Sequence, residues 1–320
     1  MTRKTLSLKV KRTPVEPIDT AQDLYPNDPK QRFLNGVAIH PSPCIRLELG
    51  SQEYSTRAMD LITPIGMGQR GLVVAPPGSG KTTTLKHICQ AVGKAYPDIK
   101  LYALLIDERP EEVTDFTRGV AAEVYASSSD QSYAHHARLA DELLDKACKE
   151  AGEGNNVMIV IDSLTRLARV HNAERKSSGR TMSGGVDARA LEIPRKLFGA
   201  ARKIENGGSL TILATILVDT GSRMDQVIFE EFKGTGNMEL VLSREIANHR
   251  IFPAIDIAKS STRREEFLLD AKSIDQVRSL RRALTSLKPI EGAKRLAELL
   301  EKYPTNTELL DAFKPSISST

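Results

Sequence analysis

The sequence has 320 residues, of which 40% are hydrophobic and 27% charged, and its formal net charge is +4. This length and apolar content support one large domain or two modest ones with a substantial buried core. No stretch approaches the roughly 18 apolar residues of a membrane span, and the basic N-terminus lacks the apolar region of a signal peptide. Three scattered cysteines without CxxC spacing exclude a disulfide framework and a zinc site of that type. We therefore expect a cytoplasmic protein with no membrane partner and with reduced thiols at Cys44, Cys89 and Cys148.

Residues 1–45 are predicted to form a tail and linker. Five basic residues precede the first acid, Glu16, and four prolines lie between positions 14 and 29. This composition is typical of a flexible segment, and a nucleic-acid-binding arm is the alternative. The mildly basic net charge fits a nucleic-acid partner but is also ordinary for a soluble enzyme. Residues 46–320 are expected to form the folded domain.

From about Ile45 onward, apolar runs alternate with amphipathic segments. The runs are rich in Val, Ile and Leu and nearly continuous, as in parallel strands that are covered on both faces. They lie at 71–75, 100–107, 122–127, 156–162, 210–218 and 238–243. Helical patterns separate them, and residues 273–313 look entirely helical. The sequence thus predicts an α/β fold with a mostly parallel central sheet, flanking helices and a helical C-terminal end.

One expected helix, 132–151, carries two adjacent histidines. Its apolar residues fall on one side, which is typical of a helix that packs on a sheet. Because neighbouring helix residues point apart and no matching ligands appear, we expect His135 and His136 to be solvated rather than to bind a metal.

The segment APPGSGKT, residues 75–82, predicts a phosphate-binding loop between a strand and a helix. It departs from the pattern G-x-x-x-x-G-K-[ST] at its first position, which is Ala75. Glycines in the loop let backbone N–H groups close around phosphate, and the helix that follows adds its positive N-terminal end. Lys81 should reach the β- and γ-phosphates and serve catalysis, and the Thr82 hydroxyl should ligate Mg²⁺. The predicted ATP-binding residues of this segment are Gly78, Ser79, Gly80, Lys81, Thr82 and Thr83.

Two further predicted strands end in carboxylates. The strand NVMIVID ends in Asp162, which we expect to hold Mg²⁺ through water, with a helix N-cap at Asp162 or Ser163 as the alternative. In LLIDERPEEV, Glu108 is predicted to polarise the water that attacks the γ-phosphate. Asp107 and Arg109 are expected to support it, or else to form a local ion pair. Together these residues predict an enzyme that hydrolyses ATP with Mg²⁺.

Longer segments carry a family resemblance. They are LLIDERPEEVTDF, VIDSLTRLARVHN, SGGVDARAL, KLFGAARKIENGGSLTILAT, VDTGSRMDQVIFEEFKGTGNMELVLSR and RIFPAIDIAKSSTRREE. With the phosphate loop they resemble the ATPase core of the bacterial Rho transcription termination factors, from about residue 30 to the C-terminal helices. The resemblance implies a RecA-like P-loop ATPase domain, a homohexameric ring with ATP between subunits, and RNA in the central hole. It also implies RNA-dependent ATPase and helicase activity, and RNA polymerase as a further partner.

Two segments match the family's RNA-binding channel loops. Residues 177–191 correspond to the Q-loop and residues 219–224 to the R-loop, and both are polar, glycine-rich and basic, as contacts with an RNA backbone require. The resemblance carries the RNA role to Arg180, Thr181, Gly184, Gly185 and Arg223. Arg180 and Arg223 stand where the family typically has lysine, and Thr181 where valine is typical, so the positive charge is kept.

The resemblance also assigns residues around the nucleotide. Arg263 matches the arginine finger that acts on the γ-phosphate bound by the neighbouring subunit. Arg250 matches a second arginine near that phosphate, and Phe252 matches the ring that packs on adenine. Ser261 stands where the family usually has glycine, and Gly78 where it often has a lysine beside the phosphates. The second change is expected to weaken nucleotide binding or to alter turnover.

The expected function is an ATP-driven RNA translocase of the Rho type. Only about 30 residues precede the core, too few for the five strands of the family's OB-fold, so we expect no primary RNA-binding domain. One alternative is a Rho-derived RNA-binding or regulatory subunit that co-assembles with another Rho chain, and intact Lys81, Glu108, Asp162 and Arg263 argue against it. A DNA-directed RecA-like ATPase is disfavoured by the channel loops.

Overall fold

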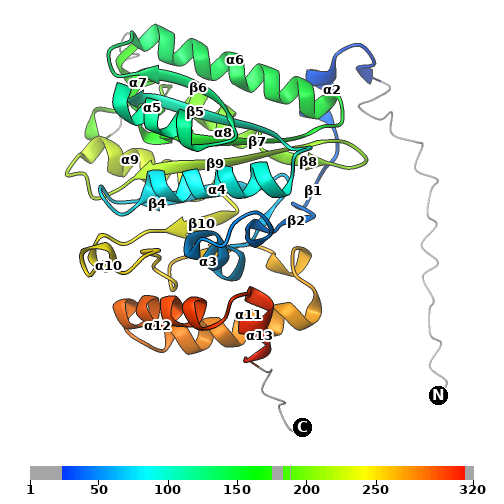
Figure 1. Ribbon diagram of the computed structural model, residues 1–320. Coiled ribbons are helices and arrows are strands. Elements are labelled where there is room, and N and C mark those ends of the chain that lie inside the picture. The colour runs from blue at the N-terminus through cyan, green and yellow to red at the C-terminus, as the bar shows by residue number, and fades with distance from the viewer. Residues whose placement is uncertain (1–23, 175–182, 188, 314–320) are drawn as a thin grey trace, which may run out of the picture.

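The computed structural model describes residues 24–174, 183–187 and 189–313, which form an α/β fold with helices on both faces of a sheet (Figure 1). The central strands are parallel, in the order β10 (Met238–Val241), β4 (Arg70–Ala75), β9 (Ser209–Leu217), β7 (Asn156–Asp162), β5 (Lys100–Glu108) and β6 (Glu123–Ser128). Short antiparallel strands extend them: β11 (Ser261–Thr262) on β10, β8 (Arg202–Ile204) on β9, and β1 (Ala38–Ile39) on β8. β2 (Cys44–Ile45) and β3 (Ile65–Gly66) form a separate pair. The predicted parallel sheet is confirmed.

Helices fill the two faces and the C-terminal end. They are α2 (Pro29–Asn35), α3 (Tyr54–Ile62), α4 (Lys81–Ala95), α5 (Pro110–Gly119), α6 (Tyr133–Gly152), α7 (Leu164–Glu174), α8 (Glu192–Gly199), α9 (Arg223–Phe232), α10 (Arg244–Asn248), α11 (Ala271–Thr285), α12 (Pro289–Lys302) and α13 (Asn306–Asp311). Figure 1 shows α6 on one side of the sheet, α4 on the other, and α11 to α13 beyond α3. Within the described residues, no helix is long and apolar enough to cross a membrane.

The strand β4 shows why the apolar runs are nearly continuous. Val73 and Ala75 belong to the core that includes α4, whereas Leu72 and Val74 belong to the core that includes α6 and α7. All four side chains are buried. Because successive strand residues point to opposite faces, a strand that is covered on both sides needs apolar residues at every position.

His136 is buried rather than solvated as expected, and His135 is half-buried. The Nδ1 atoms of both rings lie close to the hydroxyl oxygen of Ser127, at 2.6 and 2.7 Å, and His136 is 1% exposed. Ser132 caps α6, so both histidines lie in its first turn, against the end of β6. Burial lowers the pKa of His136. No group of three or more metal-binding side chains occurs in the described ranges.

Part of the expected linker is folded onto the domain. Asp28 caps α2, and Phe33 from this helix is 1% exposed and packs in the core that includes α6. Lys30 pairs with Asp145 of α6 at 2.6 Å. Burial of Phe33 explains the difference from the prediction, because an aromatic side chain contributes a large apolar area to a core. The tail expected over residues 1–23 lies outside the described residues.

Buried polar contacts attach the C-terminal helices to the segment before the phosphate loop. Glu48 Oε1 accepts a hydrogen bond from the backbone N–H of Asn306 at 2.6 Å. Arg57 of α3 donates to the carbonyl oxygens of Leu300 and Tyr303 at 2.7 and 2.6 Å. Arg57 and Glu48 are 2% and 8% exposed, and charged groups are buried at low cost only when they are partnered in this way.

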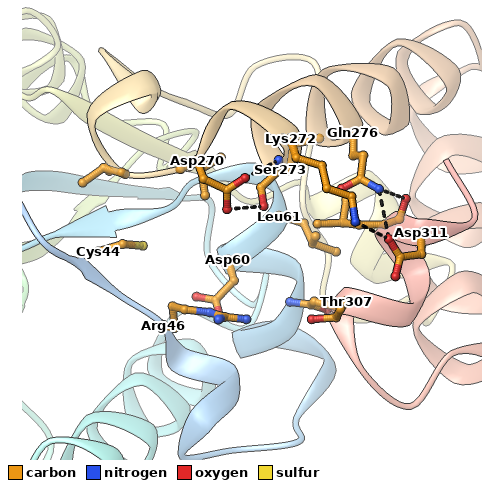
Figure 2. A pocket seen from close by; sticks show the side chains of 15 residues that line it. Cys44, Arg46, Asp60, Leu61, Asp270, Lys272, Ser273, Gln276, Thr307 and Asp311 are labelled. Atoms are coloured by element: carbon orange, nitrogen blue, oxygen red, sulfur yellow. Dashed lines mark hydrogen bonds and ion pairs between the residues drawn. The ribbon is translucent and has the colours of Figure 1, made fainter. Parts of the chain in front are cut away.

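A cavity of about 360 Å³ lies beside this junction, between β2, α3 and the C-terminal helices (Figure 2). Figure 2 shows Asp60 of α3 near Arg46, and Lys272 of α11 pointing toward Asp311, with which it forms an ion pair of 3.0 Å. Burial raises the pKa of Asp60 to about 7, although its carboxylate accepts two backbone hydrogen bonds. None of the predicted site residues lines this cavity.

Candidate functional site

The phosphate loop has the expected backbone shape. It connects β4 to α4, and Gly78 and Gly80 adopt left-handed φ values of 72° and 95°, a region that favours glycine. Ser79 is 1% exposed, and its hydroxyl donates to the carbonyl oxygen of Pro76 at 2.7 Å. The free N–H groups at the start of the 15-residue helix α4 face this loop, which suits it to bind an anion.

Arg244 contacts the same loop from α10, which sequence reasoning missed. Its Nη1 donates to the carbonyl oxygen of Pro77 at 2.5 Å. A Cβ atom added at Gly78 would lie 1.9 Å from this nitrogen, so the guanidinium fills the space that a side chain at position 78 would use. The loop therefore keeps a cation beside Gly78, where the family often has a lysine.

Three predicted residues converge at the carboxyl ends of neighbouring strands. Lys81 Nζ lies 2.7 Å from Asp162 Oδ2 and 3.2 Å from Glu108 Oε1. Asp162 is 1% exposed and accepts a hydrogen bond from the Thr215 hydroxyl at 2.8 Å. The Ser163 hydroxyl, rather than Asp162, accepts from the backbone N–H of Arg166 at the start of α7. Asp162 is thus directed to the phosphate loop, and the N-cap alternative applies to Ser163 alone.

This convergence shifts the protonation of its members. Burial, the Asp162 charge and a hydrogen bond with Glu112 raise the pKa of Glu108 to about 7, although Lys81 and Arg166 oppose the shift. Burial lowers the pKa of Lys81, but the two carboxylates outweigh it and the net pKa is raised. Lys81 therefore stays charged, while Glu108 titrates near neutral pH, which suits a general base.

Arg166 holds Glu108 in place and was also missed. Its Nη2 lies 3.2 Å from Glu108 Oε2, and its Nη1 donates to the backbone oxygen of Asp107. Asp107 has a φ of 56°, and β5 is bulged between Ile106 and Glu108, which re-aims the side chain that follows. The expected Asp107–Arg109 pair does not form, because Asp107 pairs with Arg166, whereas Arg109 is exposed and pairs with Glu112.

A hydroxyl and a carboxylate beside the loop could hold a divalent cation. Thr82 Oγ1 lies 3.3 Å from Asp162 Oδ2. Both are hard oxygen donors, which Mg²⁺ prefers, and this ion usually takes one or two protein ligands together with phosphates and waters. The donor set therefore fits Mg²⁺.

A cavity of about 620 Å³ opens beside the loop. Ser79, Gly80 and Thr83 line one end, and residues 50–55 and 252–254 line the walls. The ring of Phe252 is 47% exposed at this cavity, as a stacking surface for a flat base would be. Arg250 is exposed two residues earlier, with a φ of 58°.

Arg263 lies at the amino ends of the strands, opposite to the carboxyl ends at which the phosphate loop lies. It follows β11, and its backbone N–H donates to Asn237, next to the amino ends of β10 and β4. The phosphate loop follows the carboxyl end of β4, and the five residue steps from Arg70 to Ala75 cover about 17 Å at about 3.3 Å each. Arg263 is therefore far from the phosphate loop of its own chain.

The two predicted channel loops meet. A Cβ atom at Gly184 would lie 2.8 Å from the backbone oxygen of Arg223, so the chain segments are in close contact. Arg223 begins α9, where Asp225 is 1% exposed and pairs with Arg169 of α7 at 2.5 Å. Gly185 also has a positive φ, of 76°. Arg180 and Thr181 lie outside the described residues.

The chain is similar in sequence and in fold to several known proteins. Residues 55–262 match the nucleotide-binding domain of the ATP synthase alpha/beta family. The chain is 52% identical to the transcription termination factor Rho of Streptobacillus moniliformis, over 84% of this chain and 65% of that protein. It is 46% identical to the transcription termination factor Rho of Haemophilus influenzae, over 93% of this chain and 72% of that protein. An ATPase from the type III secretion system of pathogenic bacteria shares the fold, with a TM-score of 0.70 and 23% identity over 97% of this chain and 92% of that one.

Proposed function

Because the chain belongs to the Rho family of transcription termination factors, we propose that it hydrolyses ATP in a ring of identical subunits and moves along RNA. The observation that carries this proposal is the convergence of Lys81, Glu108 and Asp162 beside an open cavity with an exposed aromatic ring. The chain spans 65% of the length of one relative and 72% of another. Transcription termination, contact with RNA polymerase and a cytoplasmic location are therefore part of the proposal.

The phosphates of ATP bind at the loop and the start of α4, with the base against Phe252. Lys81 leaves the carboxylates and pairs with the β- and γ-phosphates. Thr82 and Asp162 would hold Mg²⁺, which would neutralise negative charge on the phosphates when bound. Glu108, oriented by Arg166, accepts a proton from the attacking water.

The second half of the site comes from the next subunit. Arg263 lies at the far edge of its own sheet, so its guanidinium serves the γ-phosphate bound by a neighbour, and we assign Arg250 to the same phosphate. An arginine supplied in trans stabilises the charge of the transition state. Hydrolysis then depends on assembly of the ring, because no chain holds both halves.

RNA in the channel is coupled to hydrolysis through α7. Arg169 of this helix pairs with Asp225 beside the R-loop residue Arg223, and Arg166, one turn earlier, pairs with Glu108. A shift of the R-loop when RNA binds therefore changes the position of Arg166, and with it the position of Glu108 beside the attacking water.

ATPase assays with RNA, with DNA and without nucleic acid test the proposal. We expect stimulation by RNA alone, and none in a Lys81→Ala variant. A mixture of Lys81→Ala and Arg263→Ala subunits should recover part of the activity, because some interfaces combine an intact loop with an intact finger. RNA binding without hydrolysis would instead support a Rho-derived binding subunit, and stimulation by DNA would support a DNA-directed ATPase.

A further inference from the structure

The backbone that carries Arg263 is attached firmly to the sheet, while its side chain is free. The Arg263 N–H donates to the carbonyl oxygen of Asn237 at 2.9 Å. The preceding residue, Thr262, pairs with Met238 in the sheet, and its hydroxyl donates to the carbonyl oxygen of Pro64 at 2.8 Å. In contrast, Arg263 is exposed, and no carboxylate among the described residues pairs with its guanidinium. The main chain is fixed and the guanidinium can reach a neighbour.

Asn237 is in turn bonded to the start of β4 through both its backbone and its side chain. Its backbone N–H donates to the carbonyl oxygen of Arg70 at 2.9 Å. Its Oδ1 accepts from the Arg70 N–H at 2.9 Å and from Gln69 Nε2 at 2.6 Å. Gln69 is 1% exposed, and its Oε1 accepts from the Gly66 N–H at 3.1 Å. Each polar atom named here has a partner, as a rigid support requires.

This support works against electrostatic repulsion. Burial together with the nearby charges of Arg202 and Arg263 lowers the pKa of Arg70. The guanidinium of Arg263 therefore lies near a like charge, that of Arg70, at the amino ends of the strands.

We propose that Gln69 and Asn237 are positioning residues for the arginine finger, because their hydrogen bonds fix the backbone from which Arg263 reaches the next subunit's ATP. This inference rests on the proposed role of Arg263 in trans. A displacement of about 1 Å can cost about 100-fold in rate, so a loosened finger should lower kcat strongly while ATP binding at the subunit's own loop is kept.

Mixed-subunit ATPase assays test the proposal with Asn237→Ala. In a homogeneous ring we expect kcat to fall at least about tenfold, with the KM for ATP nearly unchanged. Mixing with Lys81→Ala subunits, which supply an intact finger, should restore part of the activity. Mixing with Arg263→Ala subunits should restore none, because every finger in that mixture is impaired.

A second variant, Gln69→Glu, breaks the hydrogen bond between residues 69 and 237 from the side of residue 69. Its carboxylate would face the Asn237 Oδ1 atom, and if the Asn237 amide flipped, its NH₂ group would face the Arg70 N–H donor instead. We expect this variant to give the same mixing pattern as Asn237→Ala. The control is Asn306→Ala, which removes a buried asparagine, 4% exposed, at the C-terminal helices. Asn306→Ala should lower stability without showing this pattern.

The opposite mixing pattern would overturn the inference. If Asn237 acts only on its own phosphate loop through β4, Arg263→Ala subunits would restore activity and Lys81→Ala subunits would not. Recovery with neither partner, or wild-type activity in both variants, would also overturn it. The mixture of Lys81→Ala with Arg263→Ala is run alongside, and its failure to recover would refute the trans finger and this inference together.

Discussion

Replacing Glu108 with glutamine should lower the rate of hydrolysis strongly and at the same time stabilise the fold at alkaline pH. Glu108 is 3% exposed. Its burial is the largest cause, and the charge of Asp162 the next, that raises its pKa from an ordinary value of 4.5 to about 7. At pH 8 the folded chain therefore holds an ionised carboxylate in a place that favours the neutral acid. Glutamine keeps the shape of the side chain and removes the charge.

The size of the effect follows from the shift in pKa. One pKa unit corresponds to about 1.4 kcal/mol, so a rise from 4.5 to about 7 limits the cost of the ionised form to about 3 kcal/mol. The opposing attraction of Lys81 and Arg166 is already contained in this shift, so we expect a gain of up to about 3 kcal/mol at pH 8. Between pH 4.5 and 7 the folded state holds a proton that the unfolded state has released, so wild-type stability falls as the pH rises through this window. The advantage of the variant should fall below about 1 kcal/mol at pH 5.

Urea unfolding at pH 5 and pH 8, at one protein concentration, measures this gain, and steady-state ATPase assays measure kcat. The loss of a general base should lower kcat by about 100-fold or more, with ATP binding kept. Glu111→Gln is the matched control, because Glu111 is an exposed carboxylate in the first turn of α5, and neither quantity should change. A stability gain that is equal at both pH values would refute the electrostatic reasoning, and an unchanged kcat would remove Glu108 from the mechanism.

Substitutions at three other positions test other parts of the site. Phe252→Ala should raise the KM for ATP about fivefold with kcat kept, since an aromatic stack contributes about 1 kcal/mol, and Phe252→Tyr should resemble the wild type. Arg223→Ala should remove the stimulation by RNA and leave the KM for ATP unchanged; a normal RNA response would exclude this arginine from the RNA site. Asp225→Asn should lower the free energy of unfolding by about 1 to 3 kcal/mol, because it weakens a buried charged pair with Arg169, and should also weaken the RNA response. A variant that is less stable but fully stimulated by RNA would show that this pair only holds the fold.

The central sheet could be predicted because burial on both faces leaves a strong pattern. The ends of the six parallel strands lie within about two residues of the ends of the predicted runs. Methods of assigning the ends of secondary-structure elements differ by the same amount. The antiparallel strands were missed because each has two or three residues and depends on a distant partner, as β1 does on β8. His136 was misread because its burial comes from contact between α6 and the end of β6, which helix periodicity does not show.

The candidate site was predictable where a residue follows a buried strand or the glycine-rich loop. Parallel strands bring their carboxyl ends to one edge, so Asp162 and Glu108 had to lie near Lys81. Arg166, Thr215 and Arg244 reach the site from the next helix, a neighbouring strand and α10, and only tertiary packing shows that they do.

The position of Arg263 limits what single variants can reveal about this protein. The loop and Arg263 lie at opposite ends of β4, so in the ring that we propose one subunit would contribute to two different ATP sites. A ring of identical Lys81→Ala subunits and a ring of identical Arg263→Ala subunits should both be inactive, although each loses a different half of every site. The same holds for Asn237, which touches the strand of one half and the backbone of the other. Homogeneous preparations therefore cannot distinguish a defect in the loop from a defect in the finger, whereas mixtures can, because they place an intact half of one chain against an intact half of another.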